Sequence, residues 1–256
     1  MEKPIENLIQ HLSKQTKKII SQDKLQELVY LSFWENTPIS KIYKLTYQLK
    51  NRWILYPLRK ELFYISTPDS QVSQEEIEEK RYWKILKEHC NNISKQRYIW
   101  WLVALEINLH GNWVTTPEDI IIVNKEKQTS ETIMFDKSIN FKKYEIKWKS
   151  LLPILIKQTN NTSIQNSGKL LVANLELSII ESLYNTDITD KWYTEECIKK
   201  AIKKNWKSLN LSVLETIIKQ WKHNTSLNRL YNITKSSYPT LAEEIKKLVK
   251  KYWFVL

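Results

Sequence analysis

The chain has 256 residues and a mass of 30.8 kDa, and 42% of its residues are hydrophobic, enough to build the core of one large domain or two smaller ones. Charged residues make up 27% of the chain, and the mean hydropathy is -0.48. No apolar run approaches the roughly 18 residues that a membrane helix needs. The N-terminal stretch MEKPIENLIQHLSKQTKK lacks the continuous apolar segment of a secretory signal. We therefore expect a cytoplasmic protein with no membrane partner.

The positions of the cysteines exclude two kinds of site, and the distribution of charge suggests where partners bind. Cys90 and Cys197 are far apart and belong to no CxxC motif, which excludes a disulfide scaffold and the usual zinc knuckle, so we expect both to be core residues. Basic residues outnumber acidic ones by 11 to 6 in residues 1–68 and by 13 to 3 in residues 198–256, whereas residues 69–197 carry 16 basic and 19 acidic side chains. Two basic ends around a slightly acidic middle suggest two surfaces with different partners.

Glycine and tryptophan occur in unusual numbers. Average usage predicts roughly 18 glycines in a chain of this length, yet there are 2 glycines beside 11 tryptophans. One cause would explain both numbers: a gene whose UGA codons the cell reads as glycine, translated here as tryptophan. We keep this as a hypothesis to be tested at individual positions.

The first 51 residues show three helical patterns. Apolar residues recur at helical spacing over about 4–13 and 22–31, which predicts two helices. Thr37 as an N-cap, with Pro38 at the first helical position, predicts a third helix that ends near Asn51. The residues expected on its buried side are Ile42, Leu45 and Leu49.

Two strand patterns follow, Ile54–Leu58 and Leu62–Ser66, and predict a hairpin. Three helices and a hairpin are typical of the winged helix, a helix-turn-helix variant whose third helix enters the major groove of DNA. We therefore expect a DNA-binding domain over residues 1–68, with double-stranded operator DNA as its partner; the alternative is a protein-docking module. The expected phosphate contacts are Lys41, Lys44 and Lys50, the expected base contacts are Tyr43, Tyr47 and Gln48, and Arg59 and Lys60 form the wing tip.

The remaining chain is predicted to form a mixed α/β domain over residues 73–256. The polar stretch 66–73 separates the two patterned regions, and Ser73 with Glu76 forms a capping box for a helix to about His89. Further helices are expected near 101–109, 175–184, 194–204, 209–220, 226–235 and 240–252, and strands near 120–123, 132–135, 144–148 and 170–173. The predicted fold class is α+β: an N-terminal winged helix-turn-helix, then a mixed α/β domain with a helical C-terminal tail.

The sequence contains no motif that predicts catalysis. The four histidines show no HExxH or other paired spacing, and the pair Gly168-Lys169 lacks the remainder of a P-loop. We therefore expect a protein that is not an enzyme and that uses no cofactor and no metal.

The basic C-terminal region offers a second candidate surface. Lysines recur at a spacing of four residues on two predicted helices, and polar residues surround a helix start where an anion or a carboxylate could bind. The residues are Lys199, Lys200, Lys203, Lys204, His223, Asn228, Arg229, Lys246 and Lys250. Their expected partner is an acidic protein face or the DNA that flanks the operator; the alternative is capping residues beside ordinary solvated lysines.

Three stretches resemble the AbiEi family of antitoxins and transcriptional regulators. Leu45–Ile65, LTYQLKNRWILYPLRKELFYI, resembles part of the family's winged helix, and Tyr98–Gly111, YIWWLVALEINLHG, resembles the opening of its second domain. Asn174–Tyr184, NLELSIIESLY, resembles a short helix with a leucine-rich, acidic core. The resemblance implies that the winged helix represses the protein's own operon and that the second domain counteracts a nucleotidyltransferase toxin encoded nearby.

Two other functions stay open. The chain is a stand-alone transcriptional regulator if its second domain senses a ligand or dimerises. It is a nucleic-acid-targeted enzyme, such as a nuclease, if acidic side chains converge in a pocket of that domain.

The chain departs from the family pattern where that pattern has glycine. Trp53 stands where a glycine follows the recognition helix, and Trp100 and Trp101 stand where glycine precedes the next helix. The left-handed conformation common at helix ends is easy for glycine and costly for a bulky residue. Trp53, Trp101 and Trp221 are therefore the positions that we expect to be glycine in the cell, and Trp83 is expected to be a genuine tryptophan.

Overall fold

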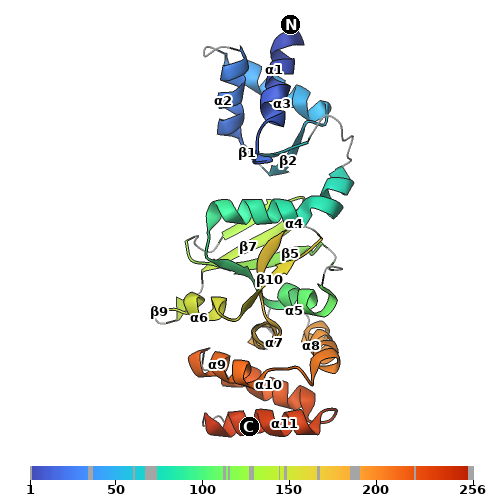
Figure 1. The fold of residues 1–256 in the computed structure, drawn as a ribbon, viewed down its shortest axis with the longest axis vertical. Helices are drawn as coiled ribbons and strands as arrows, with labels where there is room; N and C mark the ends of the chain where they lie inside the picture. Colours follow the sequence, from blue (N-terminus) through green and yellow to red (C-terminus); the bar gives the residue numbers. More distant parts are fainter. Residues whose placement is uncertain are drawn as a thin grey trace. The chain divides into compact units, whose positions relative to one another are not determined.

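The computed structural model describes residues 2–33, 37–59, 61–66, 74–111, 114, 116–126, 130–143, 145–146, 149–165, 168–184, 191–221 and 223–252. The chain mixes helices and sheets, as predicted, and divides into two compact units (Figure 1). The first unit contains Met1–His89 and Ile133–Lys137, and the second contains Cys90–Thr132 and Ser138–Leu256.

Three helices and a small sheet form the body of the first unit. In chain order they are α1 (Glu2–Ser13), β1 (Ile19–Ser21), α2 (Gln22–Phe33), α3 (Ile39–Asn51), β2 (Leu55–Arg59) and β3 (Leu62–Ile65). The helices and the β2–β3 hairpin occupy the ranges that the hydrophobic spacing predicts. Their apolar sides meet in one core, made of Leu8, Leu12, Ile20, Leu25, Leu28, Val29, Ile42, Leu45, Leu49, Ile54, Leu55, Phe63 and Ile65.

Helix α3 begins one residue later than expected. Pro38 is its N-cap, with φ -60° and ψ 146°, and there is no side-chain capping bond, so the prediction of Thr37 as the N-cap is wrong. The extended ψ of Pro38 places this residue outside the helix while its carbonyl accepts hydrogen bonds from the N–H groups of Lys41 and Ile42 at 2.9 and 3.2 Å. Ile39 thereby becomes the first helical residue.

The sheet of the first unit has three antiparallel strands with β3 in the centre. β1 pairs with β3 through Ile19 opposite Tyr64, and β2 pairs with β3 through Leu55 opposite Ile65. β2 contains Pro57 and a register shift after it, which an edge strand tolerates because an outer N–H needs no partner in the ladder. β1 was not predicted, since three residues are too few to show a periodic pattern.

Helix α4 (Gln74–Ile93) groups with the first unit as far as His89. Within that unit Arg81 Nη1 donates a hydrogen bond to Tyr64 Oη at 2.7 Å, and Lys137 Nζ lies 3.3 Å from Glu78 Oε1. The expected boundary and Ser73 of the capping box lie outside the described residues, as does the side chain of Glu76. The observed division falls within α4 rather than in the polar stretch before it.

A six-stranded mixed sheet lies mainly in the second unit, apart from its residues within Ile133–Lys137. Its strands are β4 (Arg97–Ile99), β5 (Asp119–Asn124), β6 (Ser130–Met134), β7 (Lys137–Lys143), β10 (Thr159–Ser163) and β11 (Lys169–Ala173), in the order β10-β11-β4-β5-β7-β6. β11 runs parallel to β4 and β5 runs parallel to β7, whereas β4 and β5 are antiparallel. A short separate hairpin joins β8 (Glu145–Ile146) to β9 (Lys149–Ser150).

The strands that the sequence did not predict carry weak hydrophobic signals. β4 has three residues, and β10 has the sequence TNNTS with no buried residue. β7 alternates, with Ile139 and Phe141 buried between polar neighbours. The strand expected at 144–148 coincides only with β8, because Tyr144 and the residues 147–148 lie outside the described part of the chain.

Helices follow the sheet in the C-terminal part of the second unit, as predicted. They are α7 (Leu175–Tyr184), α8 (Lys191–Asn205), α9 (Leu211–Trp221), α10 (Asn224–Thr234) and α11 (Pro239–Lys251), and two earlier helices, α5 (Trp101–His110) and α6 (Leu152–Ile156), lie beside the sheet (Figure 1). α7 packs on α5 and α10, and α10 packs on α11. Cys90 and Cys197 are both buried and form no disulfide within the described part of the chain, in agreement with the expectation that they are core residues.

A buried carboxyl group ties α7 to the start of α5. Glu181 is fully buried; its Oε1 accepts a hydrogen bond from Tyr98 Oη at 2.8 Å and its Oε2 accepts one from the backbone N–H of Trp101 at 3.1 Å. Burial raises the pKa of Glu181 to about 8, although these hydrogen bonds, the Trp100 side chain and the nearby Lys142 act in the opposite direction. The folded protein therefore holds this carboxyl protonated at neutral pH.

We expect Glu181 to make the free energy of unfolding depend on pH. Its pKa in the folded state, about 8, lies above the ordinary value of 4.5, so its contribution is complete below pH 4.5 and is lost as the pH rises toward 8. Urea unfolding of the wild type and of Glu181→Gln at several pH values should show a difference between the two proteins that changes by a few kcal/mol across this interval. Parallel stability curves would contradict a protonated, buried Glu181.

Candidate nucleic-acid interface

The outward face of α3 carries most of the residues predicted to contact DNA. Lys41, Tyr43, Lys44 and Tyr47 are exposed, and Gln48 and Lys50 are partly exposed. The two tyrosine side chains are 62% and 65% exposed. Because Ile42, Leu45, Thr46 and Leu49 are buried on one side of the helix, the residues on the opposite side face outward. The predicted stripe is confirmed, and the face opposite it is basic and aromatic.

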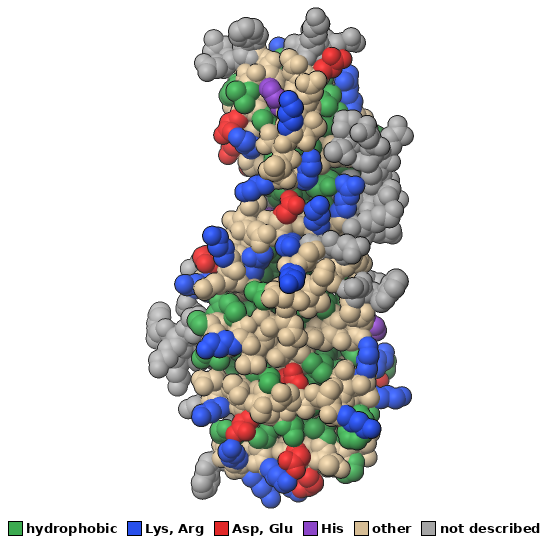
Figure 2. Space-filling view, in the orientation of Figure 1, with side chains coloured by type: hydrophobic (Ala, Val, Ile, Leu, Met, Phe, Trp, Pro, Cys, Tyr) green, Lys and Arg blue, Asp and Glu red, His purple; other side chains and the backbone are tan. Residues whose placement is uncertain are grey.

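Two of the cations rest on aromatic rings at the edges of this face. Lys41 Nζ lies 5.1 Å from the centre of the Phe33 ring, and Lys50 Nζ lies 5.1 Å from the centre of the Phe63 ring. Such contacts hold a lysine stem while its charge stays available to solvent or to a phosphate. Figure 2 shows that basic side chains outnumber acidic ones on the visible face of this unit.

The β2–β3 hairpin follows α3, as predicted, and its turn contains the expected wing tip. The backbone of Arg59 ends β2 and pairs with Leu62. The Arg59 side chain and the whole of Lys60 lie outside the described residues, so their role as wing contacts stays a prediction.

Sequence reasoning missed two exposed residues of α3. Ile39 is 61% exposed, and Arg52 is exposed at the C-cap. Arg52 follows Lys50 in the sequence, so its charge could have been included. The exposure of Ile39 could not be predicted from the sequence, because an apolar residue near a helix start is normally assigned to the core.

The lysines of the predicted second surface are partly paired. On α8, Lys199 Nζ lies 2.8 Å from Glu196 Oε1 and Lys204 Nζ donates a hydrogen bond to the carbonyl of Leu109 at 2.5 Å, while Lys200 and Lys203 are exposed. On α11, Lys246 Nζ lies 3.2 Å from Glu243 Oε1 and Lys250 is exposed. Exposed pairs of this kind reduce the local positive charge while adding little stability.

The polar group at the start of α10 is largely structural. Arg229 Nη1 donates a hydrogen bond at 2.7 Å to the carbonyl of Leu183 at the end of α7, and His223 Nδ1 lies 2.9 Å from Ser226 Oγ. Burial and the Arg229 charge lower the pKa of His223 to about 4, so this ring is neutral at physiological pH. Asn228 is partly buried on the same helix. A neutral histidine and an arginine bonded to the end of α7 give these residues a structural role, although α10 begins at the N-cap His223 without a side-chain capping bond.

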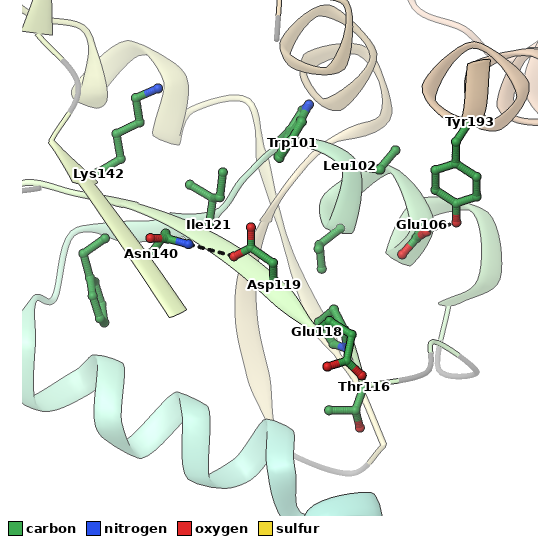
Figure 3. A pocket seen from close by; sticks show the side chains of 13 residues that line it. Trp101, Leu102, Glu106, Thr116, Glu118, Asp119, Ile121, Asn140, Lys142 and Tyr193 are labelled. Atoms are coloured by element: carbon green, nitrogen blue, oxygen red, sulfur yellow. Dashed lines mark hydrogen bonds between the residues drawn. The ribbon is translucent and has the colours of Figure 1, made fainter. Parts of the chain in front are cut away.

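A pocket of about 750 Å³ opens beside α5 in the second unit (Figure 3). Its lining is Trp101, Leu102, Val103, Glu106, Thr116, Pro117, Glu118, Asp119, Ile121, Asn140, Phe141, Lys142 and Tyr193. Tyr193 Oη donates a hydrogen bond to Glu106 at 2.6 Å, which raises the pKa of Tyr193, and Asn140 Nδ2 donates one to Asp119 at 2.8 Å. Burial lowers the pKa of Lys142, whose Nζ lies 4.5 Å from the centre of the Trp100 ring.

The carboxylates of this pocket do not form a metal-binding cluster. Among the residues that the structure describes, no three His, Cys, Asp or Glu side chains stand close enough together to hold one ion. Glu106 and Asp119 are each engaged with a neighbouring side chain instead.

Comparison with known proteins finds similar solved structures but no matching family model or curated protein sequence. The crystal structure of the RV2827C protein from Mycobacterium tuberculosis is similar to this chain with a TM-score of 0.63 and 9% sequence identity, covering 96% of this chain and 81% of that one. At this identity the likeness shows a shared fold alone. Within the described ranges, no helix has both the length and the apolar character to cross a bilayer.

The neutral state of His223 predicts a loss of stability in acid. Its pKa in the folded protein, about 4, lies below the ordinary 6.5, so its contribution is complete above pH 6.5 and is lost as the pH falls toward 4. His223→Gln should remove this part of the dependence, and thermal unfolding between pH 4 and 7 measures it. If wild type and variant lost stability in parallel over this interval, His223 would be charged in the folded protein.

Proposed function

We propose that this protein is a DNA-binding transcriptional autorepressor of the AbiEi antitoxin type, whose first unit is a winged helix that binds operator DNA. The observation that carries the proposal is the exposed, basic and aromatic face of α3, followed in the chain by a hairpin. A helix that buries one stripe in its own domain and presents lysines and tyrosines on the other suits the major groove.

The topology of the first unit supports this proposal. Its elements follow in the order α1, β1, α2, α3, β2, β3, and its sheet has the strand order β1-β3-β2. A winged helix has this arrangement, in which the hairpin extends from the sheet beside the recognition helix. A protein-docking module could use the same fold, but it has no need for Lys41, Lys44 and Arg52 on the exposed face.

The role of the second unit rests on the resemblance of Tyr98–Gly111 and Asn174–Tyr184 to the AbiEi family. On this basis we propose that the second unit counteracts a nucleotidyltransferase toxin encoded nearby. Co-expression of the protein with the product of the neighbouring gene tests this role: relief of growth arrest supports it, and continued arrest contradicts it.

The pocket beside α5 favours a second candidate function. A cavity of about 750 Å³ with both apolar and charged walls has the size of a small-molecule site. A stand-alone regulator whose operator affinity changes when a metabolite occupies this pocket is therefore the alternative. Absence of a toxin gene beside this gene, together with a ligand-dependent change in DNA affinity, would favour it.

DNA binding by α3 predicts a specific effect of removing one lysine. Lys44→Ala should weaken binding to the protein's upstream region and reduce the slope of log affinity against log salt by about 1, because one phosphate contact is lost. Titration of labelled duplex at several salt concentrations measures this slope. The control is Lys125→Ala, which removes an exposed lysine of the second unit and should leave the slope unchanged. Equal slopes for wild type and Lys44→Ala would remove α3 from the DNA contact.

A further inference from the structure

The exposed face of α3 contains a row of large side chains with apolar surface. Ile39, Tyr43 and Tyr47 follow at intervals of four residues and are 61%, 62% and 65% exposed. Side chains four residues apart lie one above the other on a helix, so the three form a continuous line. The core stripe of α3 occupies other positions, so this row has no role in packing the first unit.

The charge around this row is complementary to DNA. Lys41 and Lys44 are exposed on the same helix, and Arg52 is exposed at its end. Cations beside an apolar line suit a duplex groove, where phosphates border the base edges. An apolar protein partner would not require these charges.

The apolar surface of this row matches one chemical group in the major groove of DNA. Ile39 has no polar atom in its side chain, and the thymine 5-methyl group is the apolar feature that base edges present in that groove. The first turns of a recognition helix are the part that reaches the bases, and Ile39 begins α3. Four residues rise by about 6 Å along a helix, which is close to two base-pair steps of about 3.4 Å.

We propose that Ile39, Tyr43 and Tyr47 read thymine methyl groups, so that the operator carries thymines about two base pairs apart where α3 enters. This inference rests on the proposed DNA-binding function and names the sequence feature that the same surface recognises. Lys41 and Lys44 give affinity for any DNA duplex, and the row of Ile39, Tyr43 and Tyr47 gives the preference for duplexes that contain thymine at these positions.

The test removes the methyl groups and nothing else. A duplex selected by the protein from random sequences is prepared with deoxythymidine and again with deoxyuridine, and the two affinities are compared. We expect the deoxyuridine duplex to bind about threefold more weakly for each contacted methyl group. Ile39→Ser should bring the two affinities closer together, whereas Leu31→Ser, at an apolar residue of α2 that is 72% exposed, should leave the ratio unchanged.

The outcomes separate this inference from the function on which it rests. Tight, sequence-selective binding that is equal for the two duplexes overturns methyl recognition and leaves the DNA-binding proposal standing. No preference for any sequence overturns both. A change in oligomeric state caused by Ile39→Ser, with DNA affinity unchanged, assigns the row to contact between copies of the chain and also overturns the inference.

A second, independent observation concerns the identity of two residues. Trp53 has φ 57° and follows the C-cap of α3; its N–H donates to the carbonyl of Lys50 at 2.9 Å, and the N–H of Ile54 donates to the carbonyl of Leu49 at 3.0 Å. These two bonds are the Schellman motif, whose left-handed position is normally glycine. Ile54 and Leu49 also share the core, which is the hydrophobic contact that commonly accompanies this motif.

At the start of α5, Trp101 likewise combines a bulky side chain with a left-handed backbone conformation. It has φ 65°, it is 6% exposed, and its indole N–H has no hydrogen-bond partner among the described residues. Its backbone N–H donates to Glu181, a contact that needs no side chain at this position. The left-handed backbone disfavours tryptophan here; an unpaired indole alone does not, because the indole of Trp83 in α4 is also buried without a partner among the described residues.

The other left-handed residues have an ordinary explanation. Glu61, Phe135, Asp136 and Gln165, together with the two tryptophans, are the described residues other than glycine with positive φ, and all four lie in turns between strands. Gly111 and Gly168 have positive φ as well. The two tryptophans instead lie at the end and the start of helices.

We infer that residues 53 and 101 are glycine in the protein made by its own cell, from UGA codons that are read as glycine there. The deficit of glycine and the excess of tryptophan agree with this inference. Position 221 does not agree with this inference. Trp221 is buried at the end of α9 and lacks a positive φ, and its ring centre lies 5.4 Å from the ring centre of Tyr184. The expectation of glycine at position 221 therefore finds no support. Trp83, buried within α4 and packed edge-on against Tyr82, is a suitable tryptophan.

A comparison of glycine with alanine isolates the backbone effect. At positions 53 and 101, glycine should give a folding equilibrium constant about 5 to 30 times larger than alanine, because only glycine lacks the Cβ that the left-handed region disfavours. At position 83, within a helix, the order should reverse by about fivefold. Urea unfolding of the six variants measures these ratios.

Mass spectrometry of the protein purified from its own cells decides the residue directly. Peptides with glycine at 53 and 101 support the inference, and tryptophan in either peptide overturns it for that position. If a variant does not fold, the peptide masses still give the answer. Alanine and glycine variants of equal stability at position 53 would remove the conformational argument.

Discussion

The first unit depends on the burial of one stripe of α3. Ile42, Leu45 and Leu49 enter a core to which all three helices and the hairpin contribute. Each buried aliphatic side chain stabilises the fold by about 1.5 to 3 kcal/mol, whereas an exposed lysine or tyrosine on the other face contributes little to stability. The packing therefore fixes the rotation of the helix about its own axis. Once that rotation is fixed, the side chains that face solvent are determined as well.

The second unit depends on a different constraint: polar groups that are buried in it need hydrogen-bond partners within the protein. The N-terminus of α5 has backbone N–H groups without partners inside the helix, and Glu181 from α7 accepts one of them while it is fully buried. A charged carboxylate in this position would be costly, so burial favours its protonated form. The same logic holds at the C-terminal end of α7, where Arg229 donates to the carbonyl of Leu183. Polar residues that looked like a binding surface in the sequence thus act as connectors between helices.

Sequence reasoning succeeded where a long periodic pattern existed. The helices of the first unit and most of those after residue 175 follow the spacing of their apolar residues, as Ile217 and Ile218 in α9 and Leu241 and Ile245 in α11 illustrate. It failed where pairing, not periodicity, creates a strand. β10 is a strand because its backbone pairs with β11, although its sequence TNNTS contains no apolar residue. The N-cap at Thr37 failed for a local reason, since the ψ of Pro38 decides where the helix begins.

The amino-acid sequence by itself determined the spacing of apolar and basic residues, and with it the three helices, the hairpin and the basic face of α3. These properties are local, because helical periodicity needs only neighbours within a few turns. Tertiary structure alone decided that Glu181 meets Tyr98 and Trp101, that Arg229 closes α7, and that residues from α5, β5, β7 and α8 surround one pocket. Those contacts join residues far apart in the chain. Only the packing of whole elements brings them within hydrogen-bonding distance.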